Sequence, residues 1–501
     1  MPDQVAASTP GGFLLVLALM LPVAGLLPAL VLGGRHAERI ALALTPVGLA
    51  LAVAIAAAVL RTDTALVYVV GGWAPPLGIA LRADGLSAAM LLTTALVIGA
   101  TALFARAEFG TPPGVTEARA PLAFWTLLLG VWAAMNAVLL GGDLFNLFVA
   151  LELLTFSAVP LVCLDGRAET MRAALRYLLF ALLGSVLYLL GVALLYGAYG
   201  TLDIVLLAGL VRPGPATLAA AALMTTGLLA KTALFPLHLW LPAAHAGAPA
   251  PASALLSSLV VKGSFLIVVR IWFDVMPGLP KGAAMQILAG LGAAAILFGS
   301  VLALRQARLK LLIAYSTVAQ IGYLFLMFPL AASAAAQANA WTGGMLQAIS
   351  HAFAKAAMFM AAGLIAQAAG HDRIAGLAGI GRALPMTVLA FGLGGLSLMG
   401  LPPSGGFVAK WLLLRASIDA GQWWWGLVVV TGGLLTGGYV FRVLEPALAE
   451  SGGRAHAFAP VAHDREMVAL ALAVVSMALG LLPFASFGLL QVGRLTPAIA
   501  P

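Results

Sequence analysis

The stretch KTALFPLHLWLPAAHAGAPAPASALLSSLVVK, residues 231–262, decides how the chain must fold. A continuous helix of this length would extend about 46 Å, but four prolines interrupt it. We expect the chain to break and turn near His245, which leaves Lys231 and Lys262 on two neighbouring segments. Each lysine is then about 18 Å from the turn, near the middle of a hydrocarbon layer about 30 Å thick. A lysine at that depth is costly, so its presence indicates a function.

The composition outside this stretch predicts an all-α polytopic membrane protein. Of 501 residues, 62% are hydrophobic and 9% are charged, and apolar runs of about 20 residues recur along the whole chain. The first run, near residues 11–32, follows MPDQVAASTP, which lacks the positive region of a secretory signal, so we expect a retained helix. We predict about 14 transmembrane helices, centred near residues 21, 50, 95, 130, 153, 183, 225, 262, 293, 320, 353, 398, 433 and 478.

Charge and cysteine content exclude several classes of function. The net charge is +8, but the basic residues form no patch, which argues against nucleic acid as a partner. The single cysteine, Cys163, excludes an internal disulfide and a thiolate metal cluster, and we interpret it as a small residue in a helix contact.

The distribution of basic residues between alternate loops predicts the topology. Fifteen lie in one set of loops, at positions 35, 39, 106, 119, 167, 172, 176, 305, 308, 310, 373, 382, 442, 454 and 465. Five lie in the opposite set, at positions 61, 82, 212, 281 and 494. The positive-inside rule then places the first set in the cytoplasm, and both termini on the outer side of the inner (plasma) membrane.

Two features precede the opening stretch. The segment VYVVGGWAPPLGIALRADG has two β-prone runs around a Gly-Trp-Ala-Pro-Pro turn, which predicts a short hairpin. The fifth predicted helix, GDLFNLFVALELLTFSAVPLVCL, contains Glu152 about 14 Å deeper than Asp143 at helical rise. We interpret Asp143 as an interfacial residue or N-cap. Glu152 needs a partner or a task at that depth, and a buried lysine is the expected partner.

The seventh and eighth predicted helices carry candidate proton-carrying groups. Pro236 follows Lys231 closely and predicts a helix break whose free backbone groups need a polar cavity. His238 and His245 are secondary candidates, and capping of the cytoplasmic helix ends is an equally good interpretation of both. For Lys231 and Lys262 the alternative is snorkelling, which requires a nearby interface that neither lysine has.

Later helices add further polar groups. The tenth carries Tyr315, Ser316, Thr317, Gln320 and Tyr323, a stripe that we interpret mainly as helix–helix hydrogen bonding.

In the eleventh helix, His351 and Lys355 are four residues apart and share a face, with Ser350 and Gln347 close to it. In the twelfth, several glycines and two prolines precede Lys410, which predicts a second broken helix.

The two broken helices are five helices apart, an odd offset that inverts the second copy in the membrane. We therefore predict an inverted-topology repeat of helices 4–8 and 9–13. The expected organisation is 1–119 for peripheral helices, 120–276 and 281–446 for the two repeats, and 447–501 for a C-terminal loop and helix 14.

The buried groups together predict proton movement. They show neither the ligand spacing of a metal site nor a phosphate-binding loop, so we expect no metal and no cofactor. A carboxylate at 4 Å from an ammonium contributes about 4 kcal/mol at an effective dielectric constant of about 20, comparable to the cost of burying that ammonium. Small changes in the distance between Glu152 and Lys231 could therefore load or unload a proton, which would continue through Lys262, His351 or Lys355 to Lys410.

Four segments in order, GDLFNLFVALE, the opening stretch, ISHAFAKAAMF and GLPPSGGFVAK, resemble the antiporter-like membrane subunits. This family includes the D-type subunit of Mrp-type multisubunit sodium/proton antiporters and the proton-pumping subunits of respiratory complex I and related hydrogenases. The resemblance covers residues 80–445 and implies fourteen helices with an inverted repeat. It also implies proton-translocating roles at its matched positions, which are Glu152, Lys231, Lys262, His351 and Lys410.

Within that family, Lys410 and GDLFNLFVALE are similar to the D-type subunit of Mrp antiporters, whereas the LPAAHAGAPAP turn is closer to the respiratory subunits. No long C-terminal extension of the kind in the largest members is expected. The resemblance implies a subunit of a monovalent cation (Na⁺)/proton antiporter that works with other membrane subunits in the lipid bilayer. The alternative is a proton-pumping subunit of a quinone-reducing or hydrogen-evolving complex, with no redox site of its own.

Overall fold

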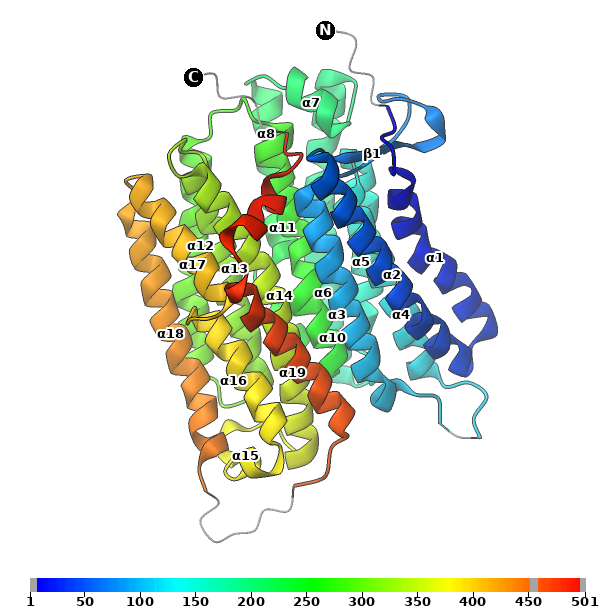
Figure 1. The fold of residues 1–501 in the computed structure, drawn as a ribbon, viewed down its shortest axis with the longest axis vertical. Coiled ribbons are helices and arrows are strands. Elements are labelled where there is room, and N and C mark those ends of the chain that lie inside the picture. The colour runs from blue at the N-terminus through cyan, green and yellow to red at the C-terminus, as the bar shows by residue number, and fades with distance from the viewer. Residues whose placement is uncertain (1–6, 113, 451–457, 496–501) are drawn as a thin grey trace.

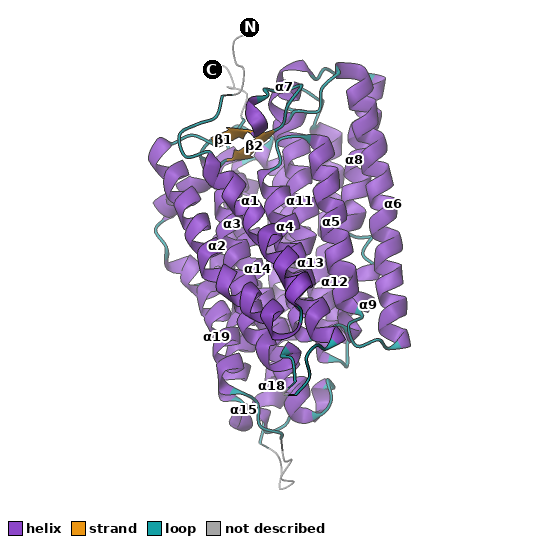
Figure 2. Ribbon diagram, turned by 90° about the vertical axis from the view of Figure 1, so that its right-hand side faces the viewer, coloured by secondary structure: helices purple, strands orange, loops and turns teal. Residues whose placement is uncertain are grey.

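The computed structural model describes residues 7–112, 114–450 and 458–495. Helices run along the long axis of the molecule and form one bundle (Figures 1 and 2). A small β-hairpin and helix α7 (Ile204–Leu210) lie at one end, called here the hairpin end, and helix α15 (Ile380–Ala383) lies at the other, the α15 end.

The N-terminal part forms one side of the bundle. Its elements are α1 (Phe13–Leu32), α2 (Gly34–Thr62), β1 (Leu66–Val69), the 3₁₀ helix η1 (Val70–Gly72), β2 (Ala80–Ala83) and α3 (Gly85–Phe109). Strands β1 and β2 are antiparallel, with Leu66 opposite Ala83 and Val69 opposite Ala80, so the predicted hairpin is confirmed. Much of α1 and α2 faces outward, as expected for peripheral helices.

The middle of the chain supplies the next group of helices. They are α4 (Arg119–Leu140), α5 (Leu144–Val162), α6 (Ala168–Tyr199), α7, α8 (Pro215–Thr232), α9 (Trp240–Gly247), α10 (Ala250–Leu255), the π-helical segment η2 (Leu256–Val260), α11 (Val261–Val269) and the π-helical segment η3 (Arg270–Val275). The last four form one continuous span over residues 250–275, called here the Lys262 span. Asp143 caps α5 by accepting from the N–H groups of Phe145 and Asn146, which confirms the predicted N-cap.

The remaining elements complete the bundle. They are α12 (Gly282–Arg305), α13 (Leu309–Ala331), α14 (Gln337–Ala369), η4 (Ile374–Gly376), α15, α16 (Pro385–Met399), α17 (Gly405–Asp419), α18 (Trp423–Leu448), α19 (His463–Ala478), η5 (Leu479–Leu481) and η6 (Phe484–Gln491). The Lys262 span is wholly buried in the bundle, and α13 and α14 nearly so. These three spans form its centre.

Eleven helices in the described residues are long and apolar enough to cross a membrane, or twelve if the bent pair of α19 and η6 is one span. The broken segments α8–α9 and α16–α17 are not among the eleven. The polytopic all-α fold is therefore confirmed, whereas the count of fourteen spans stays a prediction, as do the domain boundaries. Part of the last predicted domain, residues 451–457 and 496–501, lies outside the described residues.

Both predicted helix breaks are present, and each begins at a residue with a left-handed backbone. The C-cap of α8 is Ala233 (φ 58°), three residues before Pro236, and the C-cap of α16 is Gly400 (φ 85°), two residues before Pro402. The lysines are placed differently around these breaks. Lys231 is in the last turn before the first break, whereas Lys410 is in the helix that follows the second.

The two sets of basic loops lie at opposite ends of the bundle. The hairpin end carries the smaller set, on loops next to β1, β2, α7, α12 and η6, and the α15 end carries the larger. Arg454, of the larger set, falls outside the described residues. The first described helix starts at the hairpin end and η6 lies near it. Which end faces the cytoplasm is a prediction from the charge asymmetry.

Candidate functional site: buried lysines around broken helices

The clearest polar contact inside the bundle joins α8 to α5. The ammonium of Lys231 donates to Glu152 Oε1 at 3.0 Å and to Thr155 Oγ1 at 2.9 Å. Ser185 of α6 also donates to Glu152. The Lys231 side chain is 6% exposed and that of Glu152 is 18% exposed. The predicted partnership of this carboxylate with a buried lysine is therefore present, and Lys231 is not snorkelling to an interface.

Lys262 lies in the centre of the bundle with no exposed surface. Its ammonium donates to the backbone carbonyl of Ser257, within the π-helical segment η2. In a π-helix the backbone bonds run five residues apart, and such segments are frequent at functional sites. The lysine therefore uses a main-chain dipole where Lys231 uses a carboxylate.

Lys355 of α14 is also fully buried and reaches across to α13. Its ammonium donates to the carbonyl of Ile313 at 3.0 Å and to the hydroxyl of Ser316. Thr317, also on α13, pairs with Ser257 at 2.9 Å. The polar stripe of α13 does connect helices, as predicted, and it also holds one of the buried lysines.

His351 lies one turn before Lys355 and is 1% exposed. Neither of its ring nitrogens has a hydrogen-bond partner in the described part of the chain. Lys262, Lys355 and Lys410 are all within electrostatic range of this ring. An imidazole with both nitrogens free, placed among three lysines, can accept or donate a proton without first breaking a protein contact.

Lys410 reaches back from α17 to the end of α16. Its ammonium donates to the carbonyl of Leu398 at 2.5 Å and lies 3.3 Å from that of Met399, so it binds the C-terminal end of a helix dipole. The ring of Tyr323 is 4.2 Å from the same ammonium. One wall of an apolar groove of about 500 Å³ between α17 and α18 also includes Lys410.

A network of uncharged side chains stands next to Lys410. Gln347 donates to Gln320 at 2.9 Å, and Gln320 donates to the carbonyl of Leu398 at 3.2 Å. Leu398 thus accepts from both Gln320 and Lys410. The sequence does not predict that these glutamines meet the twelfth helix, because Gln320 and Leu398 are 78 positions apart in the chain.

The two secondary candidates differ in their surroundings. His245 has no exposed surface, stacks on Phe359 at 4.5 Å and has no partner for either nitrogen among the described residues. Capping of a helix end by His245 is therefore wrong. Lys262, Lys310 and Lys355 are within its electrostatic range. His238 packs against Phe235 and Phe298 beside the first break.

The structure thus divides the predicted residues into two groups. One is the pair of Glu152 and Lys231. The other, called here the central group, contains Lys262, His351, Lys355 and Lys410. A hydroxyl contact lies between them, because Thr232 donates to Ser264 at 2.8 Å and these residues are one and two positions from Lys231 and Lys262. No described side chain joins the two groups directly, so a proton passing between them needs water.

A polar cavity of about 350 Å³ opens at the α15 end, close to His245. Its wall includes residues 247–250, which follow α9, together with Glu108, Lys310 and Arg465. Lys310 donates to the carbonyl of Ala248 at 3.0 Å. The charged side chains of Glu108, Lys310 and Arg465 therefore line a cavity whose wall also includes Gly247, two residues after His245.

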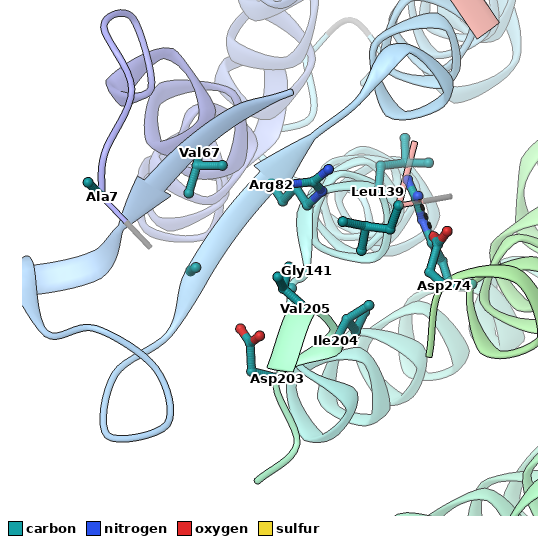
Figure 3. Close-up of a pocket in the computed structure, with 13 residues that line it drawn as sticks. Ala7, Val67, Arg82, Leu139, Gly141, Asp203, Ile204, Val205 and Asp274 are labelled. Carbon is teal, nitrogen blue, oxygen red and sulfur yellow. Dashed lines mark hydrogen bonds and ion pairs between the residues drawn. The ribbon is translucent and has the colours of Figure 1, made fainter. Parts of the chain in front are cut away.

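A buried ion cluster at the hairpin end was missed from the sequence. Arg270 donates to Asp84 at 2.5 and 2.8 Å and to Asp274 at 2.7 Å. Arg270 and Asp274 are four residues apart in an apolar run, a spacing that would have predicted an ion pair on one helix face. Asp84, however, is 186 residues away in the sequence. The cluster borders a cavity that Figure 3 shows.

Comparison with known proteins gives one family. A family model described as "NADH:quinone oxidoreductase/Mrp antiporter, TM" matches residues 141–436. The N subunit of NADH-quinone oxidoreductase from Desulforudis audaxviator is 37% identical over 77% of this chain and 77% of the relative. The D subunit of the Na⁺/H⁺ antiporter from Alkalihalophilus pseudofirmus is 30% identical over 73% of this chain and 72% of the relative.

Solved structures agree with this result. A chain in the structure of the Mrp complex from a Dietzia species superposes with a TM-score of 0.84 at 28% identity, covering 96% of both chains. The similar proteins therefore include both antiporter and respiratory subunits.

Proposed function

Because the chain belongs to the NADH:quinone oxidoreductase/Mrp antiporter family of membrane subunits, we propose that it is the proton-translocating subunit of a multisubunit monovalent cation/proton antiporter. Protons move along Glu152, Lys231 and the central group, which together are called here the proton row. The single observation that carries the proposal is the 3.0 Å contact between the buried Lys231 and Glu152. A membrane protein keeps such a pair at a cost in stability, which points to function.

The pair acts as an electrostatic switch. While Glu152 is close, Lys231 is stabilised as an ammonium, and if the two separate, the buried charge loses about as much free energy as burial costs. Separation therefore releases a proton, and closure takes one up. The proton leaves for water beside Thr232 and Ser264, and reaches Lys262 next.

The central group continues the proton path, and its side chains differ in their hydrogen-bond partners. Lys262 and Lys355 donate to main-chain carbonyls, and His351 lies within electrostatic range of both. Two ammonium groups so close repel one another, so a proton arriving on one favours release from the other. The polar cavity at the α15 end supplies protons by way of His245, and Lys410 is the last buried station.

The second candidate function is a proton-pumping membrane subunit of a respiratory oxidoreductase whose redox centres lie in other chains. The 37% identity to an N subunit favours it. The similarity of Lys410 and the GDLFNLFVALE segment to the D-type subunit of Mrp antiporters favours the antiporter. Both functions use the same row of residues, so they differ only in what drives the protons.

The test has two parts. The tagged protein is purified gently from its native membrane, and the accompanying chains are identified by mass spectrometry. Membrane-only partners support the antiporter, and iron–sulfur or nickel subunits support the respiratory complex. Vesicles containing the complex are then given a sodium gradient, and proton flux is followed with a pH-sensitive dye.

In the same vesicles, Lys231→Met and Glu152→Gln should lower proton flux at least tenfold, because each removes one half of the switch. The control is Arg382→Met, which removes an exposed cation of the pair with Glu450. Full flux in Lys231→Met would refute the proposed role of this row.

A further inference from the structure

The hairpin end contains a charged cavity that the proposed row does not use. Its volume is about 350 Å³, and its walls come from β2, the turn between α4 and α5, the start of α7 and segment η3 (Figure 3). Arg82, Asp203 and Asp274 present charged side chains to it. These charged groups suit water, protons or ions rather than an apolar ligand.

Asp274, the lining carboxylate that is bound to the buried Arg270, has spare hydrogen-bonding capacity. Both oxygens of Asp84 accept from Arg270, and Oδ1 also accepts from the N–H of Ser87. Asp274 accepts from Arg270 through Oδ2 only, and no described residue donates to its Oδ1. The Asp274 side chain is 3% exposed. Its second oxygen is therefore available to water in the cavity.

The surrounding charges favour a proton over a metal ion. Four cationic groups lie around Asp274, each on a different element: Arg270 on η3, Arg82 on β2, Lys281 before α12 and Arg494 after η6. The carboxylates are Asp84, Asp203 and Asp274 itself, and Asp143 lies beside Asp203. The charges are therefore nearly balanced, and protonation of Asp274 adds one positive charge to the set where a divalent metal ion would add two.

Asp203 stands outside the membrane spans on the same cavity. Burial raises the pKa of its carboxyl above the ordinary range of an aspartate, and backbone N–H groups at the start of α7 oppose this in part. Its neighbour Asp143 raises the pKa further. The cavity thus holds a second carboxyl that exchanges protons nearer to neutral pH than an exposed aspartate does.

The cavity lies at the hairpin end of two elements that carry residues of the proton row, the Lys262 span and α5. Asp274 is 12 residues from Lys262 on the same continuous span, about 18 Å at helical rise. Gly142, on the cavity wall, directly precedes the N-cap of α5, and Glu152 lies ten residues further along, about 15 Å away. A proton crossing either distance needs a file of several water molecules.

We propose that this cavity is the port through which protons pass between the buried row and the solution at the hairpin end, with Asp274 as the exchanging carboxylate. The inference rests on the proposed function. In each cycle Asp274 takes one proton from water on one side and gives one to water on the other. Arg270 stays bound to Asp84 in both states, so the buried guanidinium never loses its counter-charge.

The first experiment replaces the carboxylate while keeping its shape. Asp274→Asn should lower proton flux at least tenfold, with the amount of assembled complex unchanged, and Asp274→Glu should restore flux with a shifted pH profile. The matched control is Asp63→Asn at the same end, because asparagine tolerates the left-handed backbone of Asp63 (φ 51°) and Asp63 is exposed and does not line the cavity. Normal flux and an unshifted pH profile in Asp274→Asn would overturn the proposal.

The second experiment closes the cavity without touching the ion cluster. Val205→Cys is made in a Cys163→Ser background, since the chain has no other cysteine. Val205 lines the cavity and is 40% exposed. A charged, membrane-impermeant thiol reagent added at the hairpin end should label it and block proton flux. Val70→Cys, 44% exposed on η1, is the matched control that should be labelled without loss of flux.

The two experiments separate this proposal from the function it rests on. Flux is measured both with a sodium gradient and with a quinone-reducing electron donor, and each variant is expressed as a ratio to the unsubstituted complex. Absence of sodium-driven flux in that complex refutes the antiporter alone. Failure to label Val205→Cys, or labelling that leaves flux unchanged under the driving force that works, refutes the port.

Discussion

The four buried lysines are stabilised in different ways. Lys231 has a carboxylate partner, Lys262 and Lys355 use backbone carbonyls of π- and α-helical segments, and Lys410 binds the C-terminal end of α16. Among the described residues, only the first of these ammonium groups has a counter-charge in contact. A side-chain partner can move away by a rotamer change, whereas a carbonyl moves only with its helix.

The contact between Lys231 and Glu152 can be tested by a double-mutant cycle. Glu152→Gln and Lys231→Met should each lower the thermal unfolding temperature in detergent, because each leaves a buried charge without its partner. The double variant should be less destabilised than the sum, with a coupling energy of about 1–3 kcal/mol. The exposed pair of Arg382 and Glu450 should couple by less than about 1 kcal/mol. Strict additivity at Lys231 and Glu152 would contradict a direct interaction.

The sequence predicts the Glu152 contact because one carboxylate and one lysine share a similar depth in an apolar setting. It does not predict that Lys262 binds Ser257, since the π-helical turn that presents this carbonyl has no recognisable sequence pattern. The Arg270 cluster was missed for another reason. Its strongest partner, Asp84, lies on a distant element, and only the packing of α3 against the Lys262 span brings them together.

At the level of elements, the broken helices define the site. Prolines predicted both breaks, but not where each lysine lies relative to its break. Lys231 precedes the first and projects toward α5, and Lys410 follows the second and folds back on α16. The proline sets where backbone bonding stops. The direction of the side chain depends on which neighbouring helix offers an acceptor, and this is a property of the packed bundle.

The second break depends on Gly400. Its φ of 85° is unfavourable for any residue with a Cβ atom, and an added Cβ would lie 2.7 Å from Cδ of Lys410. Gly400→Ala should therefore cost about 1–2 kcal/mol in the free energy of unfolding and lower proton flux by displacing the lysine. Gly290→Ala in α12, where nothing lies within 4 Å, is the control and should be neutral or stabilising. Equal thermal stability of both variants would contradict this view of the break.

At the level of the whole molecule, charge varies along the long axis of the bundle, whereas burial varies from its periphery to its centre. The two sets of basic loops lie at opposite ends of the bundle, and burial increases from α1 and α2 toward the central spans. Composition and periodicity predicted the helical bundle, the peripheral helices and the opposite placement of the two sets of basic loops. They could not predict the cavities, because each cavity is formed by residues from several separate elements.

Orientation in the membrane follows from the charge asymmetry and can be measured in intact cells. In the Cys163→Ser background, an impermeant thiol reagent added outside should label Val70→Cys at the hairpin end. It should leave Arg382→Cys at the α15 end unlabelled until the cells are opened, because the positive-inside rule places that end in the cytoplasm. Labelling in the reverse order would invert the topology and, with it, the side of the membrane on which the proposed port opens.

The carbonyls that hold Lys410 have a consequence for how this protein can change over generations. A single nucleotide substitution can remove the carboxylate beside Lys231, but none can remove the main-chain oxygens of Leu398 and Met399. Second-site mutations that compensate for a defect at the first break should therefore arise at Lys231 or Glu152. Those that compensate for a defect at the second break should arise among the nearby glycines and prolines, because these residues change the position of Lys410 only by changing the backbone.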